Sequence, residues 1–278
     1  MFKLIAQAPD GVQLDFSATR NYQISNIDGM GPPDAIIATS KNAMTDGGVY
    51  DSAKLDTRTI VLTIAINQPA EVNRINLYKW FRTRYPVRLY YSNDARSVYI
   101  DGYVQNMSIS MFAKKQVAQV TILCPGSALL DGEERNIYIC TESTWGQYPA
   151  YTGIVNNPGD MECGATFLLQ ATAECNDIAI HNRTRTERIR FETLSMTANQ
   201  VLALNTRRGA LSARLYATMY DYTDRPYLYT DVLPLANYPN ASWPQLDPGD
   251  NDISISCNKM TQVVLQTHVI FRPQFEGV

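Results

Sequence analysis

Residues 58–66 read Arg-Thr-Ile-Val-Leu-Thr-Ile-Ala-Ile, and this stretch determines the fold expected for the first half of the chain. Apolar side chains recur at every second position from Ile60 to Ile66, which is the period of a strand with one face on a core. Proline at position 69 suits the first turn of a helix, because its missing N–H would be unpaired there anyway. We therefore expect a β domain in which a helix follows this strand.

The expected helix runs from Pro69 to near Arg84 and is stopped by Pro86. At 100° per residue, four apolar side chains share one arc that is wide enough to pack on a sheet: Ile75, Leu77, Tyr78 and Phe81. Trp80 lies outside this arc, so we expect it to face a second surface.

Further strands are expected at 87–91, 97–100 and 117–124, with a turn at 92–94 between the first two. Two interpretations of Asp101-Gly102 stay open: a tight hairpin turn, or a strand that carries a bulge and continues into Tyr103-Val104. Residues 126–134 form the expected linker. The predicted domains are therefore residues 1–132 and 133–278.

The second half has almost no helical periodicity. Short strands are expected at 166–171, 178–182, 189–194, 200–205, 211–216, 252–257 and 263–271, each bounded by turn residues. Such spacing favours a β-sandwich or jelly roll. The long proline-containing segment 220–250 is expected to be a binding surface or an arm, as loops of that length commonly are.

Composition excludes several classes of protein. The chain has 278 residues, 45% of them hydrophobic and 18% charged, which describes a folded protein rather than a disordered one. Its net charge of −3 gives no basic excess for sequence-blind binding of nucleic acid. The beginning of the sequence lacks the features of a signal peptide, and no apolar run is long enough to span a bilayer. We expect no membrane insertion.

The cysteines and histidines carry no recognisable catalytic or metal pattern. Five cysteines, at positions 124, 140, 163, 175 and 257, show no ligand spacing, so reduced and mostly buried thiols are expected. His268 alternates away from Val269 in a strand, and His181 precedes a turn. No Gly-x-Ser-x-Gly elbow or phosphate-binding loop is present. The chain is therefore expected not to be an enzyme and to need no cofactor.

Two charged stretches are assigned to structure rather than chemistry. The acidic run 247–252 lacks the spacing of a calcium loop, and turn formation around Pro248-Gly249 explains it better. The run 183–190 contains four arginines together with Glu187. We interpret it as a solvated hairpin, with an ion-pairing patch between subunits as the alternative.

Several motifs occur in a characteristic order: Tyr22-Gln-Ile-Ser-Asn-Ile-Asp-Gly-Met-Gly-Pro-Pro-Asp34, the strand 58–66, Ile100-Asp-Gly-Tyr-Val104 and Ile122-Leu-Cys-Pro125. In this order and spacing they resemble the distal tail protein (Dit) family of long-tailed bacteriophages. Looser matches are Asn157-Pro-Gly-Asp160 and the stretch 243–253.

The resemblance implies an N-terminal β-barrel-like domain with a single helix and a C-terminal galectin-like β-sandwich. It also implies a homohexameric ring at the phage tail tip or baseplate, made in the host cytoplasm, with rings that can stack. The implied partners are the tail tube protein, the tail-associated (Tal) tip protein and receptor-binding or side-fibre proteins. DNA would pass through the channel without specific binding.

Residue roles follow from this interpretation. Ring contacts are expected at Asn26, Asp28, Gly29, Arg58 and Trp80, and an outer binding surface at Trp145, Tyr227, Tyr229 and Trp243. The alternative function is a carbohydrate-binding adhesin module, in which the tryptophans would form a sugar platform. A wall-degrading enzyme is disfavoured because catalytic carboxylate pairs are missing. A contractile-tail or bacteriocin baseplate protein with the same ring role remains open.

Overall fold

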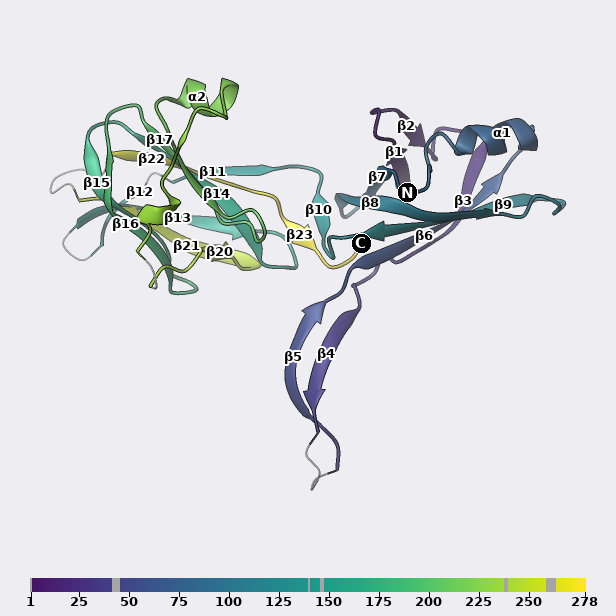
Figure 1. The fold of residues 1–278 in the computed structure, drawn as a ribbon, viewed down its shortest axis with the longest axis horizontal. Helices are drawn as coiled ribbons and strands as arrows, with labels where there is room; N and C mark the ends of the chain where they lie inside the picture. The colour runs from purple at the N-terminus through teal and green to yellow at the C-terminus, as the bar shows by residue number, and fades with distance from the viewer. Residues whose placement is uncertain (1, 42–45, 140, 146–147, 238–239, 259–263) are drawn as a thin grey trace. The chain divides into compact units, whose positions relative to one another are not determined.

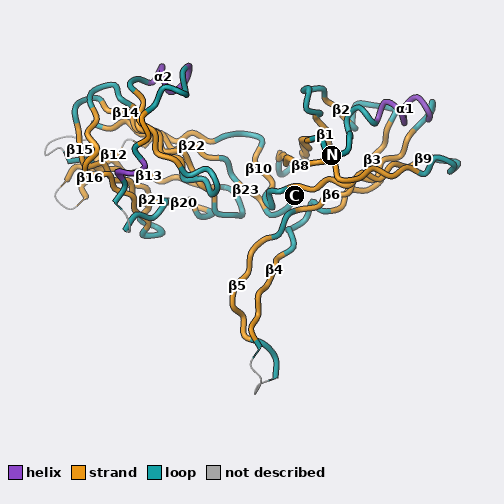
Figure 2. The backbone as a smooth tube through the Cα atoms, viewed as in Figure 1, coloured by secondary structure: helices purple, strands orange, loops and turns teal. Residues whose placement is uncertain are grey.

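The computed structural model describes residues 2–41, 46–139, 141–145, 148–237, 240–258 and 264–278, with the side chains of 141–149 outside the description (Figure 1). The chain divides into two compact units. The first consists of Met1–Gly132 together with Phe275–Val278, and the second of Glu133–Gln274. Strands dominate both units, as Figure 2 shows, so the prediction of a mainly β protein is confirmed.

The described residues of the first unit contribute to a nine-stranded sheet in the order β2-β1-β7-β8-β9-β6-β3, with β10 pairing with both β8 and β23. Its strands are β1 (Lys3–Gln7), β2 (Gln13–Asp15), β3 (Tyr22–Asp28), β6 (Arg58–Ile66), β7 (Pro86–Ser92), β8 (Ser97–Ile109), β9 (Gln116–Cys124), β10 (Leu129–Asp131) and β23 (Gln274–Phe275). The long antiparallel pairs β6–β9 and β8–β9 form its centre.

The period-two prediction for residues 58–66 is confirmed. Ile60, Leu62 and Ile64 are fully buried, and Ile66 is nearly so. They face a core that also contains Leu77 and other apolar residues of the unit.

The helix differs from its prediction. Helix α1 (Ala70–Leu77) ends well before Arg84, and a series of turns completes the connection to β7. Leu77 and Phe81 are buried as predicted, but Ile75 and Tyr78 are exposed. The third buried position of this segment is Asn73, which follows the four-residue spacing of a helix face.

Asn73 is buried because its polar groups are paired inside the unit. Its side-chain amide donates to the Asn67 carbonyl at 2.9 Å, and its own carbonyl accepts from the Tyr22 hydroxyl at 2.8 Å. The expected buried face was chosen from the apolar side chains alone, and that choice places an amide on the solvent side. The observed buried face of α1 therefore differs from the expected one, because it includes Asn73.

Strand β8 continues through Asp101-Gly102, so the hairpin alternative is wrong there. The register irregularity lies between Val104 and Asn106 instead. Glycine is needed at position 102 because a Cβ would come within 2.6 Å of the Ile122 side chain and 2.8 Å of the Cys124 sulfur. The expected linker 126–134 is also partly wrong, since it contains strand β10 of the first unit.

Strands β4 (Ala35–Ser40) and β5 (Val49–Leu55) form a separate two-stranded sheet that was not predicted. Figure 1 shows this hairpin extending away from the end of β3 and the start of β6. Every residue of its two strands is exposed. We call it the β4–β5 hairpin below.

The second unit contains two packed sheets. One follows the order β11-β22-β14-β17-β18-β19, with β20 on β14, and the other the order β12-β13-β21-β15-β16. The strands are β11 (Arg135–Ile139), β12 (Thr141–Trp145), β13 (Tyr148–Asn157), β14 (Cys163–Ala171), β15 (Cys175–Asn182), β16 (Glu187–Met196), β17 (Val201–Asn205), β18 (Ser212–Tyr216), β19 (Thr230–Asp231), β20 (Gln245–Leu246), β21 (Gly249–Ser256) and β22 (Leu265–Phe271). Both sheets contribute to one buried core, so the sandwich prediction is confirmed.

Each strand predicted between residues 166 and 271 has a counterpart, whereas β11, β12 and β13 were not predicted. Segment 220–250 is less irregular than expected, since it includes most of the short helix α2 (Met219–Asp224) and all of the 3-10 turn η1 (Leu233–Leu235). A small apolar cluster on the outer face of the sheet, around Tyr216, packs against Met219 and Tyr222 of α2.

The thiol prediction is confirmed as far as burial is concerned. Cys124, Cys163, Cys175 and Cys257 are buried, and Cys140 lies outside the described residues. Burial raises the pKa of the Cys124 thiol to about 11 and that of Cys163 to about 12. These thiols are therefore protonated near neutral pH and are unsuited to nucleophilic or metal-binding roles.

Candidate subunit interface and outer surface

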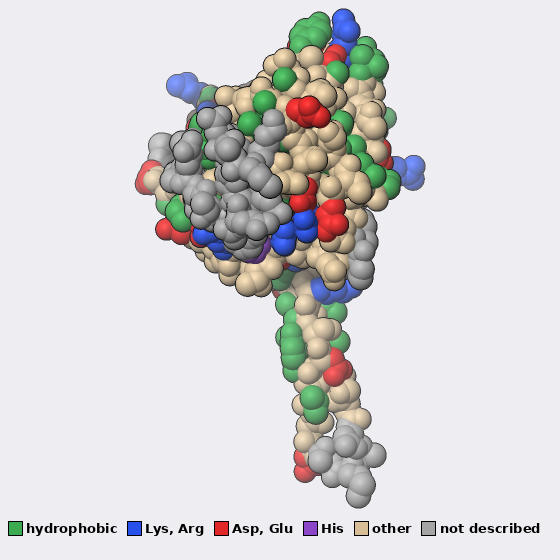
Figure 3. Space-filling model, turned by 90° about the vertical axis from the view of Figure 1, so that its left-hand side faces the viewer, with side chains coloured by type: hydrophobic (Ala, Val, Ile, Leu, Met, Phe, Trp, Pro, Cys, Tyr) green, Lys and Arg blue, Asp and Glu red, His purple; other side chains and the backbone are tan. Residues whose placement is uncertain are grey.

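The β4–β5 hairpin presents a wholly apolar stretch of one face. The register places Ala35 opposite Leu55 and Ile37 opposite Ala53, and the period of two puts all four on the same side. Ile37 is 61% exposed. Hydrophobic side chains along the hairpin are visible in the space-filling view (Figure 3).

This hairpin has little support from its own chain. Among the described residues, neither strand pairs with a strand outside the hairpin. At its base the Asp56 N–H donates to the Asp34 carbonyl at 2.8 Å. An isolated two-stranded sheet is only marginally stable in water, and exposed apolar strands with free edges tend to associate. The hairpin therefore has the properties of a docking element.

The predicted ring residues 26–29 lie on and just after β3. This strand is an edge of the large sheet, and Asn26 and Asp28 are exposed on it. Gly29 has a φ of +85°, and a Cβ there would lie 2.0 Å from the Thr59 carbonyl oxygen. Glycine is thus required at position 29 by the backbone itself. The contact role of Asn26 and Asp28 stays a prediction.

Arg58 makes contacts inside the first unit, and its expected role as a ring contact stays a prediction. Its side chain is only 3% exposed. The guanidinium donates to four backbone carbonyls of the first unit, those of Gly29, Gly31, Ser127 and Glu276, at 2.5–2.9 Å. Burial lowers the pKa of Arg58, but an arginine remains charged at any physiological pH.

The carbonyls around Arg58 belong to three chain segments that are far apart in sequence. They are the turn after β3, the segment after β9 and the segment that returns from the second unit. Nearby, Arg96 donates to the Gly277 carbonyl and stacks over the Phe275 ring at 4.5 Å. These contacts place residues 275–278 in the first unit, whereas the sequence had assigned them to the second domain.

Trp80 is half-buried against the core of the first unit. Its ring lies edge-to-face with that of Tyr22, with a centroid distance of 6.4 Å. Within the described structure its indole Nε1 is buried without an acceptor. The structure therefore gives Trp80 a packing role, and its role as an interface anchor stays a prediction.

The predicted outer surface separates into two places in the second unit. Tyr227 is 72% exposed, and Tyr229 is exposed beneath the Arg214 guanidinium, 4.4 Å from its ring centroid. Trp243 instead packs, half-buried, against the core between the sheets. Trp145 ends β12, and its side chain is outside the described part of the structure. The role of these residues as an outer binding surface stays a prediction.

The arginine run 183–190 forms ion pairs with neighbouring carboxylates of its own unit, which fits the interpretation as a solvated hairpin. Arg185 pairs with Glu162, Glu187 and Asp247, and Arg190 lies 2.5 Å from Asp177. The acidic run 247–252, which follows β20, contains a turn that a single side-chain amide stabilises.

That amide is the Asn251 side chain, which accepts from the Asp247 N–H at 2.9 Å and donates to the Asp247 and Gly249 carbonyls. Turn formation therefore accounts for the acidic run 247–252. Among the described residues, no group of three or more histidine, cysteine or carboxylate side chains is placed to hold a metal ion. None of the described helices has the length and apolar character to cross a membrane.

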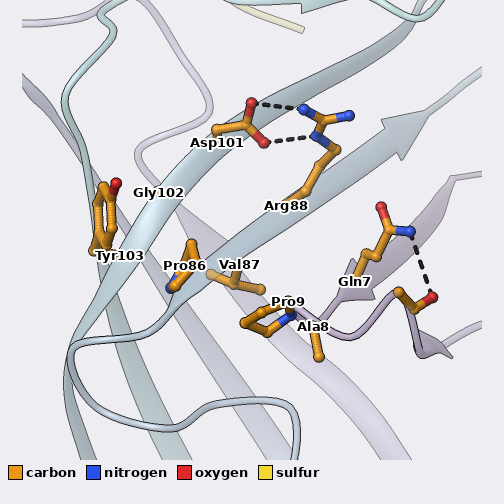
Figure 4. Close-up of a pocket in the computed structure, with 10 residues that line it drawn as sticks. Gln7, Ala8, Pro9, Pro86, Val87, Arg88, Asp101, Gly102 and Tyr103 are labelled. Carbon is orange, nitrogen blue, oxygen red and sulfur yellow. Dashed lines mark hydrogen bonds and ion pairs between the residues drawn. The ribbon is translucent and has the colours of Figure 1, made fainter.

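An open pocket of about 440 Å³ lies beside the end of β1, the start of β7 and the middle of β8 (Figure 4). Its one carboxylate, Asp101, forms a two-pronged ion pair with Arg88 at 2.6 and 2.8 Å, which raises the pKa of Arg88. The ten residues that line it include no histidine, cysteine or serine. This pocket therefore lacks the acid–base pair that hydrolysis would need.

Two comparisons with known proteins agree with the sequence resemblance, one with family models and one with solved structures. Residues 10–124 match the family model described as the phage tail protein RIFT-related domain. A search of curated proteins gives no match.

Among solved structures, the Dit protein of phage SPP1 is similar over 99% of both chains, with a TM-score of 0.70 and 13% identity. It is described as a paradigm of the hub adsorption apparatus in phages that infect Gram-positive bacteria. A chain of the phage P2 baseplate in its activated conformation with calcium is similar over the full length of both chains, with a TM-score of 0.52 and 8% identity. The first unit therefore matches a phage tail domain family, and the whole chain shares its fold with these two phage proteins, which supports the resemblance to siphophage Dit proteins.

Proposed function

We propose that this chain is the hub subunit of a phage tail tip, where six copies close into a ring through their first units. The ring would join the tail tube to the tail-associated tip protein and leave a channel through which DNA passes without specific binding. The second units, whose galectin-like character is part of the proposal, would contact receptor-binding or side-fibre proteins. The similarity to phage tail and baseplate proteins supports a structural role in the tail.

The β4–β5 hairpin is the observation that carries the ring proposal. It extends from the first unit and exposes Ile37, Val49 and Tyr50, each more than 60% accessible in the single chain. Burying such side chains against another copy would gain hydrophobic free energy and shield the free strand edges. If the hairpin of one copy contacts a different surface on the next copy, the interface is head-to-tail. Repeated head-to-tail interfaces form a closed ring when the rotation between neighbouring copies brings the last copy back to the first.

A second candidate function concerns the outer tyrosines of the second unit. Tyr227 and Tyr229 are exposed, and the Arg214 guanidinium lies over the Tyr229 ring. Exposed aromatic rings provide the flat apolar surfaces on which sugar rings stack. A carbohydrate-binding adhesin module is therefore the alternative, and binding to a glycan array that is lost in Tyr227→Ala would support it.

The ring proposal is tested by the native mass of the purified chain over a concentration series, with negative-stain images of the same samples. We expect six-membered rings, alone or stacked, of subunits of 31.2 kDa. A variant in which residues 35–55 are replaced by a short Gly-Ser turn should remain folded but form no rings. Rings of normal mass from that variant would refute the role of the hairpin. A wild-type chain that stays monomeric, even with tail tube protein present, would refute the hub proposal.

A further inference from the structure

A cluster of tyrosines fixes the segment after α2 on the outer face of the second unit. Tyr216 of β18 is 3% exposed, and its ring centroid lies 5.4 Å from that of Tyr222 and 5.9 Å from that of Tyr229. Its hydroxyl donates to the Pro226 carbonyl at 3.4 Å. The side chains that this segment presents to solvent are therefore carried by an ordered backbone, which reduces the entropy lost when a ligand binds.

Two arginines of this surface stack on tyrosine rings and have no carboxylate partner. The Arg214 guanidinium lies 4.4 Å from the Tyr229 ring centroid, and that of Arg225 lies 5.2 Å from the Tyr220 centroid. Neither forms an ion pair within the part of the chain that the structure describes. Five other arginines of the same unit do pair with carboxylates, namely Arg183, Arg185, Arg190, Arg207 and Arg208. Stacking orients a guanidinium but leaves its N–H donors available to an anion.

Tyr227 supplies an open aromatic ring two residues after Arg225. It is 72% exposed, and its ring stacks on no other ring or cation among the described residues. Tyr229 differs, because its contacts with Tyr216 and Arg214 occupy its ring. An open tyrosine ring is a flat apolar surface with a polar tip, which is the shape on which a sugar ring stacks.

Three aspartates lie along the same segment, and each accepts a hydrogen bond from a neighbouring residue at 2.7–3.0 Å: Asp221, Asp224 and Asp231. A carboxylate has about four acceptor positions, so each can also accept from the hydroxyls of a ligand. Two arginines among three aspartates give no positive excess for a dense polyanion such as DNA. Because aspartate is depleted at the centre of protein–protein interfaces, this composition favours a hydroxyl-rich ligand with isolated negative groups.

We propose that this surface, formed by Arg214, Tyr220, Arg225, Tyr227 and the three aspartates, binds an acidic glycan, which is a sugar chain that carries carboxylate or phosphate groups. A sugar ring stacks on Tyr227, and an anionic group accepts hydrogen bonds from Arg225 and Arg214. Hydroxyls of the sugar donate to the aspartates. The proposal rests on the second candidate function, the carbohydrate-binding module, and names the class of its ligand.

Calorimetric titration of the full chain with four probes tests the class of ligand. The probes are a galacturonic acid tetramer, the matching neutral galactose tetramer, a glucose tetramer with one phosphate, and a poly-glutamate peptide. We expect an acidic tetramer to bind about tenfold more tightly than the neutral one, as one charge-assisted hydrogen bond would give. Raising the NaCl concentration from about 50 to about 500 mM should reduce this preference, because salt screens exposed charges.

Substitutions test the site itself. Arg225→Gln should remove the preference for acidic tetramers and retain binding of the neutral one, whereas Tyr227→Ala should weaken binding of every glycan. Arg225→Lys should retain part of the preference, since it keeps the charge but not the planar donor set. Arg82→Gln and Tyr85→Ala are the matched controls, because both remove exposed side chains of the same types from the first unit. They should bind like the wild type, and circular dichroism should show every variant folded.

Each contrary result overturns a different part of the proposal. Equal affinities for acidic and neutral tetramers would overturn the acidic class and leave the carbohydrate-binding candidate standing. Binding of no glycan would overturn both, and binding of the poly-glutamate peptide alone would assign the surface to an acidic protein partner instead. Wild-type affinities in Arg225→Gln and Tyr227→Ala would overturn the site. The ring proposal is unaffected by all of these results, because native mass tests it separately.

Discussion

Replacing Arg58 with methionine should destabilise the first unit more than any surface substitution. The change keeps much of the length of the aliphatic stem but removes the guanidinium that binds the carbonyls of Gly29, Gly31, Ser127 and Glu276. Because the side chain is 3% exposed, water cannot simply take its place at those carbonyls.

The magnitude follows from two opposing terms. Hydrogen bonds from a charged donor contribute about 1.5–3 kcal/mol each, so four of them amount to roughly 6–12 kcal/mol. Against this stands the cost of burying a guanidinium, which is several kcal/mol and is no longer incurred in the variant. The expected net loss in the free energy of unfolding is therefore about 3–5 kcal/mol.

Urea unfolding with a probe in the first unit measures this loss, and Trp80 fluorescence is suitable because Trp145 and Trp243 both belong to the second unit and can be replaced by phenylalanine. Arg58→Lys is the matched variant: it retains the charge but cannot direct donors to three segments at once, so it should lie between the wild type and Arg58→Met. A loss of less than 1 kcal/mol in Arg58→Met would refute the reasoning.

Three further predictions concern both units of the chain. A chain that ends at Gln274 should lose stability in the first unit and leave the unfolding of the second unchanged by differential scanning calorimetry, because the Phe275 ring leaves a core. Gly29→Ala should lower the free energy of unfolding by about 2 kcal/mol or more, because an alanine at this positive φ would be strained and its Cβ would clash with the Thr59 carbonyl. An unchanged midpoint in chemical unfolding would contradict this. Cys124 and Cys163 should resist alkylation at pH 8, followed site by site by mass spectrometry. Their folded pKa values lie above the ordinary value of 9.0, so stability should hold below pH 9 and fall as pH rises toward 11 and 12.

Local periodicity accounts for most of what could be predicted from the sequence. Strand β6 and the strands between residues 166 and 271 followed from alternating or β-branched runs bounded by turn residues. The β4–β5 hairpin was missed although Gly47-Gly48 lies between two alternating runs, which is a usable hairpin signal. Its residues face no core of their own chain, so burial gave no reason to expect an ordered element there.

Local sequence patterns did not predict the contacts of Arg58 or the buried face of α1. Arg58 was expected at a ring contact, but its contacts with carbonyls up to residue 276 depend on segments separated by as many as 218 positions. The buried face of α1 includes Asn73 and leaves out Ile75, unlike the expected face, because hydrogen bonds inside the unit satisfy the Asn73 amide. No helical projection contains that information.

The sequence alone determined the mainly β character, the sandwich of the second half and the resemblance to phage distal tail proteins. These depend on side-chain periodicity and on the order of short motifs, both of which are local properties of the chain. Tertiary structure alone decided that residues 275–278 complete the first unit, that Arg58 is an internal clamp, and that α1 and the β4–β5 hairpin expose apolar surfaces at opposite ends of β6. Those features depend on contacts between distant segments, and such contacts exist only after the chain has folded.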